Sequence, residues 1–332
     1  MAGKNMHVVH IYKGDYKKSS RLVFQDSLFG SEFVNLKKIG LQSFVLMMLR
    51  GENKTFIFHQ QYTLHYLVFA YLLSRISPKK KHRFVYDMHD VYFVREQSGL
   101  FKKIKAMLYN ILEKVVSRFS DATITVSCGL ADEYKKRTGI DAGLVYNCYN
   151  FPFPNELVRR REVEVDSSIR AVYFGQISNE RLPLSLVKKL KSIGVYLDLY
   201  GYVSPGISQD VAEELLISYA ESGARYRGVY DPQDMSFLIG YGFSIMHFES
   251  SKFNIRYCMP NKLFQSLEYD LPCLVSRNML EAYGSFKATG YVFTLDDFAG
   301  VINPDREELE NVMSSMKNIS KLNFFSAIGC EI

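Results

Sequence analysis

The sequence predicts an α/β protein built from two Rossmann-like domains that face each other across a ligand cleft. Short apolar runs typical of buried strands alternate with longer amphipathic stretches typical of helices, and this alternation predicts parallel sheets covered by helices. The alternation breaks once, over residues 147–166, where two prolines and a charged run indicate a connection between domains. In the second half, three expected strands end at a glycine, which suits a tight turn into a ligand-binding loop.

The first half starts with an apolar strand pattern and alternates from there. Runs rich in β-branched and aromatic residues predict strands; they cover 7–12, 44–49, 55–58, 83–87, 122–126 and 143–146. Stretches with apolar residues at spacings of three and four predict helices; they cover 20–36, 64–74, 101–119 and 127–138. We expect these elements to form one domain over residues 1–150.

The second half repeats the same alternation after the break. Its expected strands cover 170–174, 196–200, 243–248 and 273–275, with one more ending at Gly228. Its expected helices cover 184–192, 211–221 and 231–240, with one more between Pro260 and Pro272. We expect a linker over 151–166, a second domain over 167–305, and a helical tail over 306–332 that packs back on the first domain.

Composition and charge restrict the class of protein. The 332 residues are 47% apolar and 23% charged, which allows two packed cores. Five scattered cysteines without a Cys-x-x-Cys pair argue against disulfides and structural zinc. We find no membrane-spanning apolar run and no signal-peptide core, so we expect a cytoplasmic protein. The net charge of +6 favours an anionic partner, and the lack of a recognisable basic module argues against nucleic acid.

The most informative stretch lies between residues 257 and 275. Pro260 suits the first turn of a helix, because its fixed φ is helical and the N–H it lacks would be unpaired there. Lys262 falls in that first turn, and Pro272 ends the helix before a short buried strand. A helix N-terminus with free N–H groups and a nearby ammonium predicts an anion site.

This stretch resembles the donor-binding segment of the group 1 (family 4-like) glycosyltransferases, which have the GT-B fold. Weaker motifs follow in the family's order, at 122–127, 172–175, 199–201 and 226–228. The resemblance covers residues 80 to 295, while residues 1 to 75 match only a general α/β pattern. It implies an enzyme that moves a sugar from a nucleoside-diphosphate sugar to a glycan or lipid-linked acceptor, in bacterial surface polysaccharide or lipopolysaccharide synthesis.

The resemblance also implies a set of donor-binding residues. Lys262 and Arg181 would offset the charge of the diphosphate, although both could also be solvated surface cations. The family's pair of glutamates is replaced here by Tyr257 and Gln265, and Gln265 can still hydrogen-bond the ribose hydroxyls. The other expected donor-site residues are Asn261, Gly175, Gly201, Glu268 and Glu249.

Candidate residues for the acceptor side follow strands of the first half. His89 stands just after the strand at 83–87, where the resemblance implies a histidine near the transferred sugar. Asp87 and Asp90 are the alternatives as general base, and His89 and Asp90 could instead cap the next segment. The loop after the first strand adds Gly14 and Arg21 as candidate acceptor or phosphate contacts. His59 also follows a strand, and for it we favour a structural role.

The sequence predicts no metal or other cofactor, because no Asp-x-Asp pair lies next to the donor motif. The stretch 101–119 combines five basic residues with apolar ones. It could rest on an anionic membrane, where lipid-linked acceptors reside, or be a packed helix with a solvated basic face. A nucleotide-sugar epimerase of the same fold is an alternative. A degenerate GT-B protein that binds nucleotide or glycan without catalysis is another.

Overall fold

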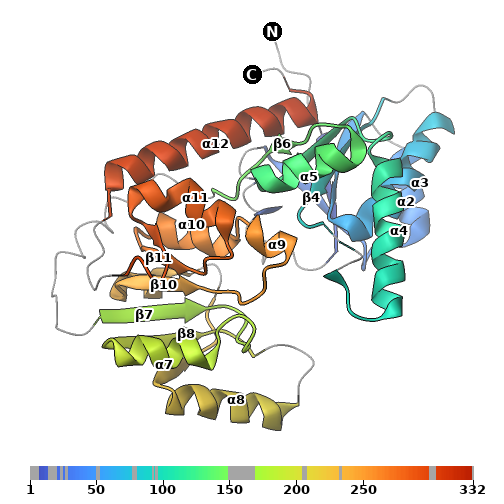
Figure 1. Cartoon of the computed structure of the whole chain (residues 1–332). Helices are drawn as coiled ribbons and strands as arrows, with labels where there is room; N and C mark the ends of the chain where they lie inside the picture. Colours follow the sequence, from blue (N-terminus) through green and yellow to red (C-terminus); the bar gives the residue numbers. More distant parts are fainter. Residues whose placement is uncertain are drawn as a thin grey trace. The chain divides into compact units, whose positions relative to one another are not determined.

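The computed structural model describes residues 7–13, 21–22, 25–26, 29–49, 53–76, 81–91, 93, 96–148, 169–203, 208–231, 234–298 and 304–330. The chain forms two compact units (Figure 1): unit 1 comprises Met1–Tyr149 and Ser315–Ile332, and unit 2 comprises Asn150–Ser314. Each unit holds a six-stranded sheet in which the described strand pairs are parallel. The α/β class is therefore as predicted, while the expected linker 151–166 lies outside the described residues.

Unit 1 has the strand order β2-β1-β3-β4-β5-β6. Because β1 lies between β2 and β3, the sheet grows in opposite directions from it, and ligands of such sheets bind at the carboxyl ends near this switch point. The strands are β1 (His7–Tyr12), β2 (Ser31–Asn35), β3 (Lys54–His59), β4 (Arg83–Met88), β5 (Ala122–Thr125) and β6 (Gly143–Leu144). The helices include α2 (Leu41–Leu49), α3 (Leu64–Ile76), α4 (Leu100–Val116) and α5 (Cys128–Thr138), with the 3₁₀ turn η2 (Gln61–Thr63) after β3.

Unit 2 has the strand order β12-β11-β10-β7-β8-β9, so its switch point lies between β7 and β10. Its strands are β7 (Ile169–Phe174), β8 (Val195–Tyr200), β9 (Ala224–Gly228), β10 (Phe243–Met246), β11 (Cys273–Val275) and β12 (Val292–Phe293). Its helices are α7 (Leu184–Ser192), α8 (Gln209–Glu221), α9 (Phe253–Arg256), α10 (Asn261–Glu268) and α11 (Leu280–Phe286), with the 3₁₀ turns η4 (Ser236–Gly240) and η5 (Lys287–Thr289). The long helix α12 (Arg306–Ile328) starts in unit 2 and ends in unit 1.

Alternation along β7 divides the core of unit 2 between the two faces of its sheet. Ala171 and Tyr173 pack with the apolar residues of α7 and α8, and both helices lie on that face (Figure 1). Val172 and Phe174 point to the opposite face, where they pack against η4 and Leu271. A strand buried on both faces therefore ends at Gly175 with its position fixed from two sides.

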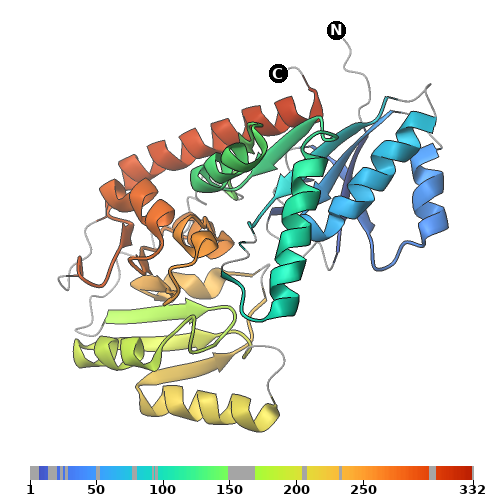
Figure 2. The same cartoon turned by 45° about the vertical axis from the view of Figure 1, so that its right-hand side comes forward.

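In unit 1, one face of the sheet packs against the end of α12, through Phe324, Ala327 and Ile328. The helices α3 and α4 contact each other and lie side by side in both views (Figure 2). α4 is anchored by Glu113, whose carboxylate is buried and pairs with Arg137 at 2.7 Å. None of the described helices is both long and apolar enough to cross a membrane.

Three sequence predictions need correction. The expected helix 20–36 is wrong in its last part, because residues 31–35 form β2, an edge strand in which only Val34 is buried. The expected strand 44–49 is part of helix α2, in which Phe44 and Met48 share the buried face one turn apart. The expected helix 231–240 is reduced to the short 3₁₀ turn η4. A short apolar run does not distinguish a strand from a helix by its period alone.

Candidate functional site

The first candidate site lies in unit 2, where two glycines end neighbouring strands. Gly175 follows β7 and Gly201 follows β8, with φ of +116° and +135°, which side chains rarely adopt. The Gly175 N–H donates to Tyr200 O at 2.8 Å, and a Cβ on Gly201 would lie 1.8 Å from Gly175 O. The two turns therefore pack backbone against backbone at the carboxyl ends of the strands, where only glycine fits.

Helix α10 brings Lys262 to the same place. A Cβ on Gly175 would lie 1.9 Å from Lys262 Nζ, so the ammonium fills the space that a side chain there would take. Nζ also lies 5.1 Å from the ring centre of Tyr173 and 5.7 Å from that of Phe174. The cation is therefore held by two ring faces at the end of β7.

The surroundings of Lys262 do not provide a negative partner. None of the ion pairs within the described part of the chain involves this lysine. Burial, with a smaller contribution from the positive charge of Arg181, lowers the pKa of Lys262 to about 7. Because a partly buried ammonium without a counter-ion is unfavourable, an anion that binds here would stabilise its charged form.

Arg181 completes a pair of cations in this region. It is partly buried in the turn that follows Gly175, and its guanidinium carbon lies 5.5 Å from the ring centre of Phe248. Its charge is close enough to Lys262 to disfavour the second positive charge. The structure therefore brings together Gly175, Gly201, Lys262 and Arg181, four of the residues predicted for the donor site.

Helix α10 also carries Asn261, Gln265 and Glu268, whose predicted contacts with the donor stay predictions. α10 begins at Asn261, and Pro260 before it offers no side-chain cap to the first N–H groups. Gln265 is partly buried on α10. Glu268 is buried on α10. The ribose contacts of Gln265 and Glu268 remain predictions.

Glu249 lies in the loop after β10. It is exposed and lines an open pocket of about 270 Å³ at the carboxyl ends of β10 and β11, together with His247 and Ser276. Its N–H donates to Glu180 O at 3.3 Å, which ties this loop to the turn that carries Arg181. Glu249 is therefore positioned at the same edge of the sheet as the cation pair.

The second candidate site lies in unit 1, around the buried carboxylate of Asp87. Asp87 is on β4, directly opposite His59 of β3 in the parallel register. The Arg21 Nε–H lies 3.0 and 2.8 Å from the two carboxylate oxygens, and its Nη2 donates to Oδ1 at 2.5 Å. Burial raises the pKa of Asp87, but the charges of Arg21 and His89 together hold it well below its usual range.

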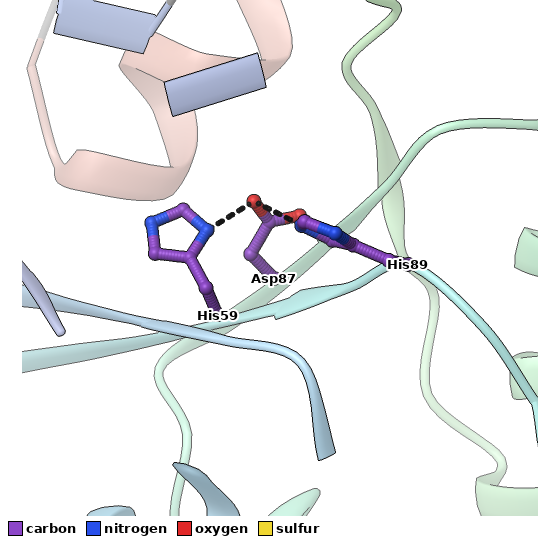
Figure 3. Close-up of side chains that lie close together, drawn as sticks. All are labelled: His59, Asp87 and His89. Carbon is purple, nitrogen blue, oxygen red and sulfur yellow. Dashed lines mark ion pairs between the residues drawn. The ribbon is translucent and has the colours of Figure 1, made fainter. Parts of the chain in front are cut away.

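Two imidazoles approach the same carboxylate oxygen from either side (Figure 3). His59 Nδ1 lies 2.8 Å and His89 Nε2 3.2 Å from Asp87 Oδ2. Neither nitrogen has an aligned hydrogen-bond acceptor, so we treat both contacts as electrostatic. Burial lowers the pKa of His59, and the interaction with the Asp87 carboxylate partly offsets this effect.

A chain of contacts leads from this centre toward the edge of the sheet. His59 Nε2 lies 2.8 Å from His10 Nδ1, and His10 Nε2 lies 3.1 Å from Ser31 Oγ. A carboxylate only accepts, so with neutral rings the protons must point from Ser31 through both histidines to Asp87. The Ser31 hydroxyl also lies 2.6 Å from Phe29 O. Its single hydrogen cannot serve both acceptors, so donation to Phe29 O would require one protonated imidazole in the chain.

His89 is held from its other side by Gln60. Gln60 Nε2 lies 3.1 Å from His89 Nδ1, and the Gln60 N–H donates to Asp87 O at 2.9 Å. The backbone of Gln60 has φ +65°, a strained conformation for a residue other than glycine. With Gln60 donating to Nδ1, the proton of a neutral His89 is on Nε2, beside Asp87.

The spacing of His59, Asp87 and His89 is compatible with a metal ion, since one ligand atom of each lies within 4.8 Å of the others. Arg21 and Gln25, however, already donate to the Asp87 carboxylate, Gln25 at 2.9 Å. A cation here would compete with a buried guanidinium for one negative charge. The geometry fits an ion-pair network better, and metal-independent chemistry remains a prediction.

The other unit 1 predictions have mixed outcomes. Asp90 is exposed, and its backbone O accepts from Gln61 Nε2 at 3.1 Å. Gly14 lies outside the described residues. Arg21 is 2% exposed and also donates to Val145 O at 2.5 Å, so its contact with a phosphate remains a prediction.

Sequence reasoning missed the cluster around Asp87. The sequence pattern singles out neither Gln60 nor Gln25, and it favours a structural role for His59. The available signal is position: His59 ends β3, the neighbour of the strand that carries Asp87, and Gln60 follows directly. Polar residues at the carboxyl ends of adjacent parallel strands are expected to meet.

Comparison with known proteins supports the fold. No family model matches the chain, and no curated protein matches its sequence. Among solved structures, it is similar to the lipopolysaccharide outer core galactosyltransferase WaaB in its apo form, with a TM-score of 0.60, 14% identity, and coverage of 98% of this chain and 99% of that one. It is also similar to HepE of Anabaena in complex with UDP-glucose, with a TM-score of 0.60, 12% identity, and coverage of 96% of this chain and 92% of that one. A third similar structure is an α,α-trehalose-phosphate synthase (UDP-forming) from Burkholderia vietnamiensis. Its TM-score is 0.60 and its identity 7%, with coverage of 97% of this chain and 95% of that one. The chain therefore has the GT-B fold of these glycosyltransferases.

Proposed function

We propose that this protein is a glycosyltransferase that moves a sugar from a nucleoside-diphosphate sugar to a glycan or lipid-linked acceptor. The likeness to WaaB, HepE and the trehalose-phosphate synthase supports this class, since the first transfers galactose to lipopolysaccharide and the second binds UDP-glucose. Bacterial surface polysaccharide synthesis is the setting that we propose.

The observation that carries the proposal is the ammonium of Lys262, which lies beside the Gly175 turn and has no ion-pair partner among the described residues. A structural lysine would normally be solvated or paired with a carboxylate. Here Nζ is instead held at the switch point of a Rossmann-type sheet, near the first turn of α10 and the guanidinium of Arg181. The leaving diphosphate carries developing negative charge, which this arrangement would stabilise without a metal ion.

In unit 1, Asp87 and His89 are the proposed acceptor-side residues. Asp87 is deeply buried and saturated by Arg21 and Gln25, so we assign it to positioning. His89 is partly exposed, at 17%, and is the group that would contact a sugar hydroxyl. We propose that Asp87 and Gln60 fix the ring and tautomer of His89 from its two sides.

Donor binding and turnover test this function directly. Purified protein should show thermal stabilisation by one of UDP, GDP or CMP, or by a corresponding nucleotide sugar, and should slowly release free nucleotide from that sugar donor. Lys262→Ala should abolish the stabilisation, while Lys188→Ala, an exposed lysine on α7, should retain it. Activity that persists in excess EDTA would support metal-independent chemistry. If Lys262→Ala bound the best ligand unchanged, the donor site would be misassigned.

A degenerate protein that binds nucleotide without catalysis is the second candidate. Gln265 and Tyr257 stand where the family carries two glutamates, and this departure favours it. The same assay separates the two: ligand-induced stabilisation with no nucleotide release, over a range of acceptor glycans, would identify a binding module.

We also propose that the protein works on the cytoplasmic face of a membrane, through α4. Its residues Leu100, Phe101 and Leu108 are 75%, 81% and 57% exposed. They belong to an exposed apolar stripe completed by Ile104, Met107, Ile111 and Val115. The acidic residue of α4, Glu113, is buried and paired with Arg137, so the exposed charges of the helix are all lysines. An apolar stripe flanked by lysines matches an anionic lipid surface.

Vesicle sedimentation tests the membrane proposal. The protein should bind vesicles rich in phosphatidylglycerol and not vesicles of phosphatidylcholine alone. The double variant Phe101→Ser and Leu108→Ser should lose binding, while Ile217→Ser and Val229→Ser, which remove exposed apolar side chains from unit 2, should not. Equal binding by both double variants would refute the role of α4.

A further inference from the structure

An open pocket on the sheet of unit 2 has no role in the proposed donor site. It has a volume of about 420 Å³ and is lined by residues of β7, β8 and β9 together with Gly223. Two of its charged residues, Arg170 and Arg225, are each the second residue of their strand, so the pocket lies near the amino ends of β7 and β9. Gly175 lies five residues beyond Arg170, or about 16 Å along an extended strand. The pocket is therefore separate from the diphosphate site of the same sheet.

The register of the strands explains why arginines gather there. Arg170 is opposite Tyr196, and Asp198 is opposite Arg225. Side chains two positions apart on a strand share a face, which puts Tyr196 with Asp198 on β8 and Arg225 with Arg227 on β9. The opposite face is covered by α7 and α8. The pocket therefore lies on the face of the sheet that α7 and α8 do not cover.

The charges in the pocket do not balance. Asp198 Oδ2 accepts from Arg170 at 2.8 Å, from Arg227 at 2.9 Å and from Tyr241 at 2.8 Å. One carboxylate therefore already faces two guanidinium groups. Burial raises the pKa of Asp198, but hydrogen bonds from Arg227, Tyr241 and Arg170 hold it below its usual range. Asp198 is ionised at neutral pH and cancels one of the positive charges.

Two arginines of the pocket have donor groups without an acceptor among the described residues. Arg225 is exposed and takes part in none of the ion pairs within the described residues. Arg227 Nε is buried and has no hydrogen-bond partner there. The pocket thus contains three arginines, Arg170, Arg225 and Arg227, and one ionised carboxylate, Asp198. Its net charge is therefore positive by two. Buried guanidinium N–H groups without an acceptor are unfavourable, and an anion with two oxygens matches their fork geometry.

The wall of the pocket adds an aromatic surface. Tyr196 is 63% exposed, although tyrosine usually buries much of its ring. Arginine pairs suit a carboxylate or a phosphate, and an exposed ring beside them suits the apolar face of a sugar. We propose that this pocket binds an anionic glycan, with its carboxylate or phosphate on Arg225 and Arg227 and a sugar ring on Tyr196. The identification as a glycan, but not the anion site itself, rests on the proposed function.

The experiment measures binding of small anionic and neutral saccharides to the whole protein by calorimetry. Trigalacturonate represents a carboxylate glycan, glucose 6-phosphate a phosphorylated sugar, and maltotriose a neutral one, while inorganic phosphate tests the anion alone. At least one acidic saccharide should bind, and maltotriose should not. Arg225→Gln should weaken that binding by about tenfold or more, and Lys188→Gln, which removes the same charge elsewhere on unit 2, should change it by less than about twofold.

Tyr196→Ala separates a glycan site from a simple anion site. It should weaken the acidic saccharide and leave inorganic phosphate unchanged. Thermal unfolding of Arg225→Gln should match that of the wild type, since this arginine forms no ion pair in the part of the chain that the structure describes. The proposal would be overturned if Arg225→Gln and Lys188→Gln bound the acidic saccharide with equal affinity. It would also be overturned if maltotriose bound as tightly as the acidic saccharides. Nucleotide stabilisation measured on the same samples reports the donor site independently, so failure here leaves the proposed transferase function standing.

Discussion

The ammonium of Lys262 occupies the space that a side chain on residue 175 would fill, 1.9 Å from the position of such a Cβ. Helix α10 and the β7 turn are thereby locked to each other at one point. The absence of a side chain at Gly175 is what allows the cation to reach the strand end. This relationship makes the glycine and the lysine a single structural unit.

Gly175→Ala should therefore disrupt nucleotide binding. The methyl group would displace Lys262 Nζ, and alanine at φ +116° would add about 1–3 kcal/mol of backbone strain. We expect affinity for the best nucleotide to fall by about tenfold or more in calorimetry. Gly194→Ala provides the control, because Gly194 has φ +81° with open space around it. If the two variants bound nucleotide equally, strain and not displacement would explain any loss.

Lys262→Met should increase stability while it removes donor binding. Burial lowers the pKa of Lys262 to about 7, whereas the unfolded lysine titrates near about 10.4. Between these values the unfolded chain binds a proton that the folded chain has released, so this group makes stability rise with pH. Below pH 7 the buried charge is fully destabilising, and the variant should gain about 1–3 kcal/mol there.

Thermal unfolding from pH 6 to pH 9 measures this effect. The difference between Lys262→Met and the wild type should be largest at pH 6 and should shrink toward pH 9. Lys188→Met, on the exposed face of α7, should show no such trend. A variant that was destabilised at pH 6 would mean that the ammonium makes a favourable interaction in the free protein.

Asp87→Asn should strongly destabilise unit 1. It leaves the guanidinium of Arg21, 2% exposed, without its negative partner, and loss of one member of a buried pair costs about 3–5 kcal/mol. The pKa of Asp87 is held well below its usual range, so its stabilisation is present above about pH 4 and disappears as pH falls through the folded value. Urea unfolding at pH 7 and at about pH 2 measures both effects.

Asp141→Asn is the matched control for this experiment. Asp141 pairs with Lys135 at 2.7 Å, but both side chains are largely exposed, and such pairs contribute about 0–1 kcal/mol. A loss at Asp87 no larger than the loss at Asp141 would show that the Arg21 pair does not hold unit 1 together.

Gln60 should control the tautomer of His89. Gln60→Gly removes the amide 3.1 Å from His89 Nδ1 and relieves the backbone strain at φ +65°, which should add about 1 kcal/mol of stability. Gln60→Ala removes the amide but keeps the strain. Long-range ¹⁵N spectra of the imidazole should show the same shift from the Nε2–H form in both variants, while Asp270→Gly, at φ 55°, should leave His89 unchanged. Unchanged His89 signals in both Gln60 variants would contradict this role.

Much of the fold could be predicted from the sequence, because the inner strands of both sheets are apolar runs that end at glycine or at polar residues. The edges could not. β2 buries only Val34 and depends on pairing with β1, which a local pattern does not reveal. In α2 nearly every residue is apolar, so the helical period is hidden.

The two candidate sites were predictable to different degrees. The one in unit 2 has a local signal, since Pro260 and Lys262 stand together at the start of a helix. In unit 1, Arg21 and Asp87 are 66 residues apart, and no spacing rule connects them. Arg21 lies outside the strands, so their pairing depends on the tertiary fold and is not visible in any local pattern.

The division of α12 affects the order in which the chain can fold during synthesis. Residues 1–149 leave the ribosome first, yet the core of unit 1 includes Phe324, Ala327 and Ile328. The nascent amino-terminal sheet must therefore wait, with one apolar face uncovered, until unit 2 has been translated. Chaperones that shield such a face during this interval would matter more for this protein than for one whose domains are completed in succession.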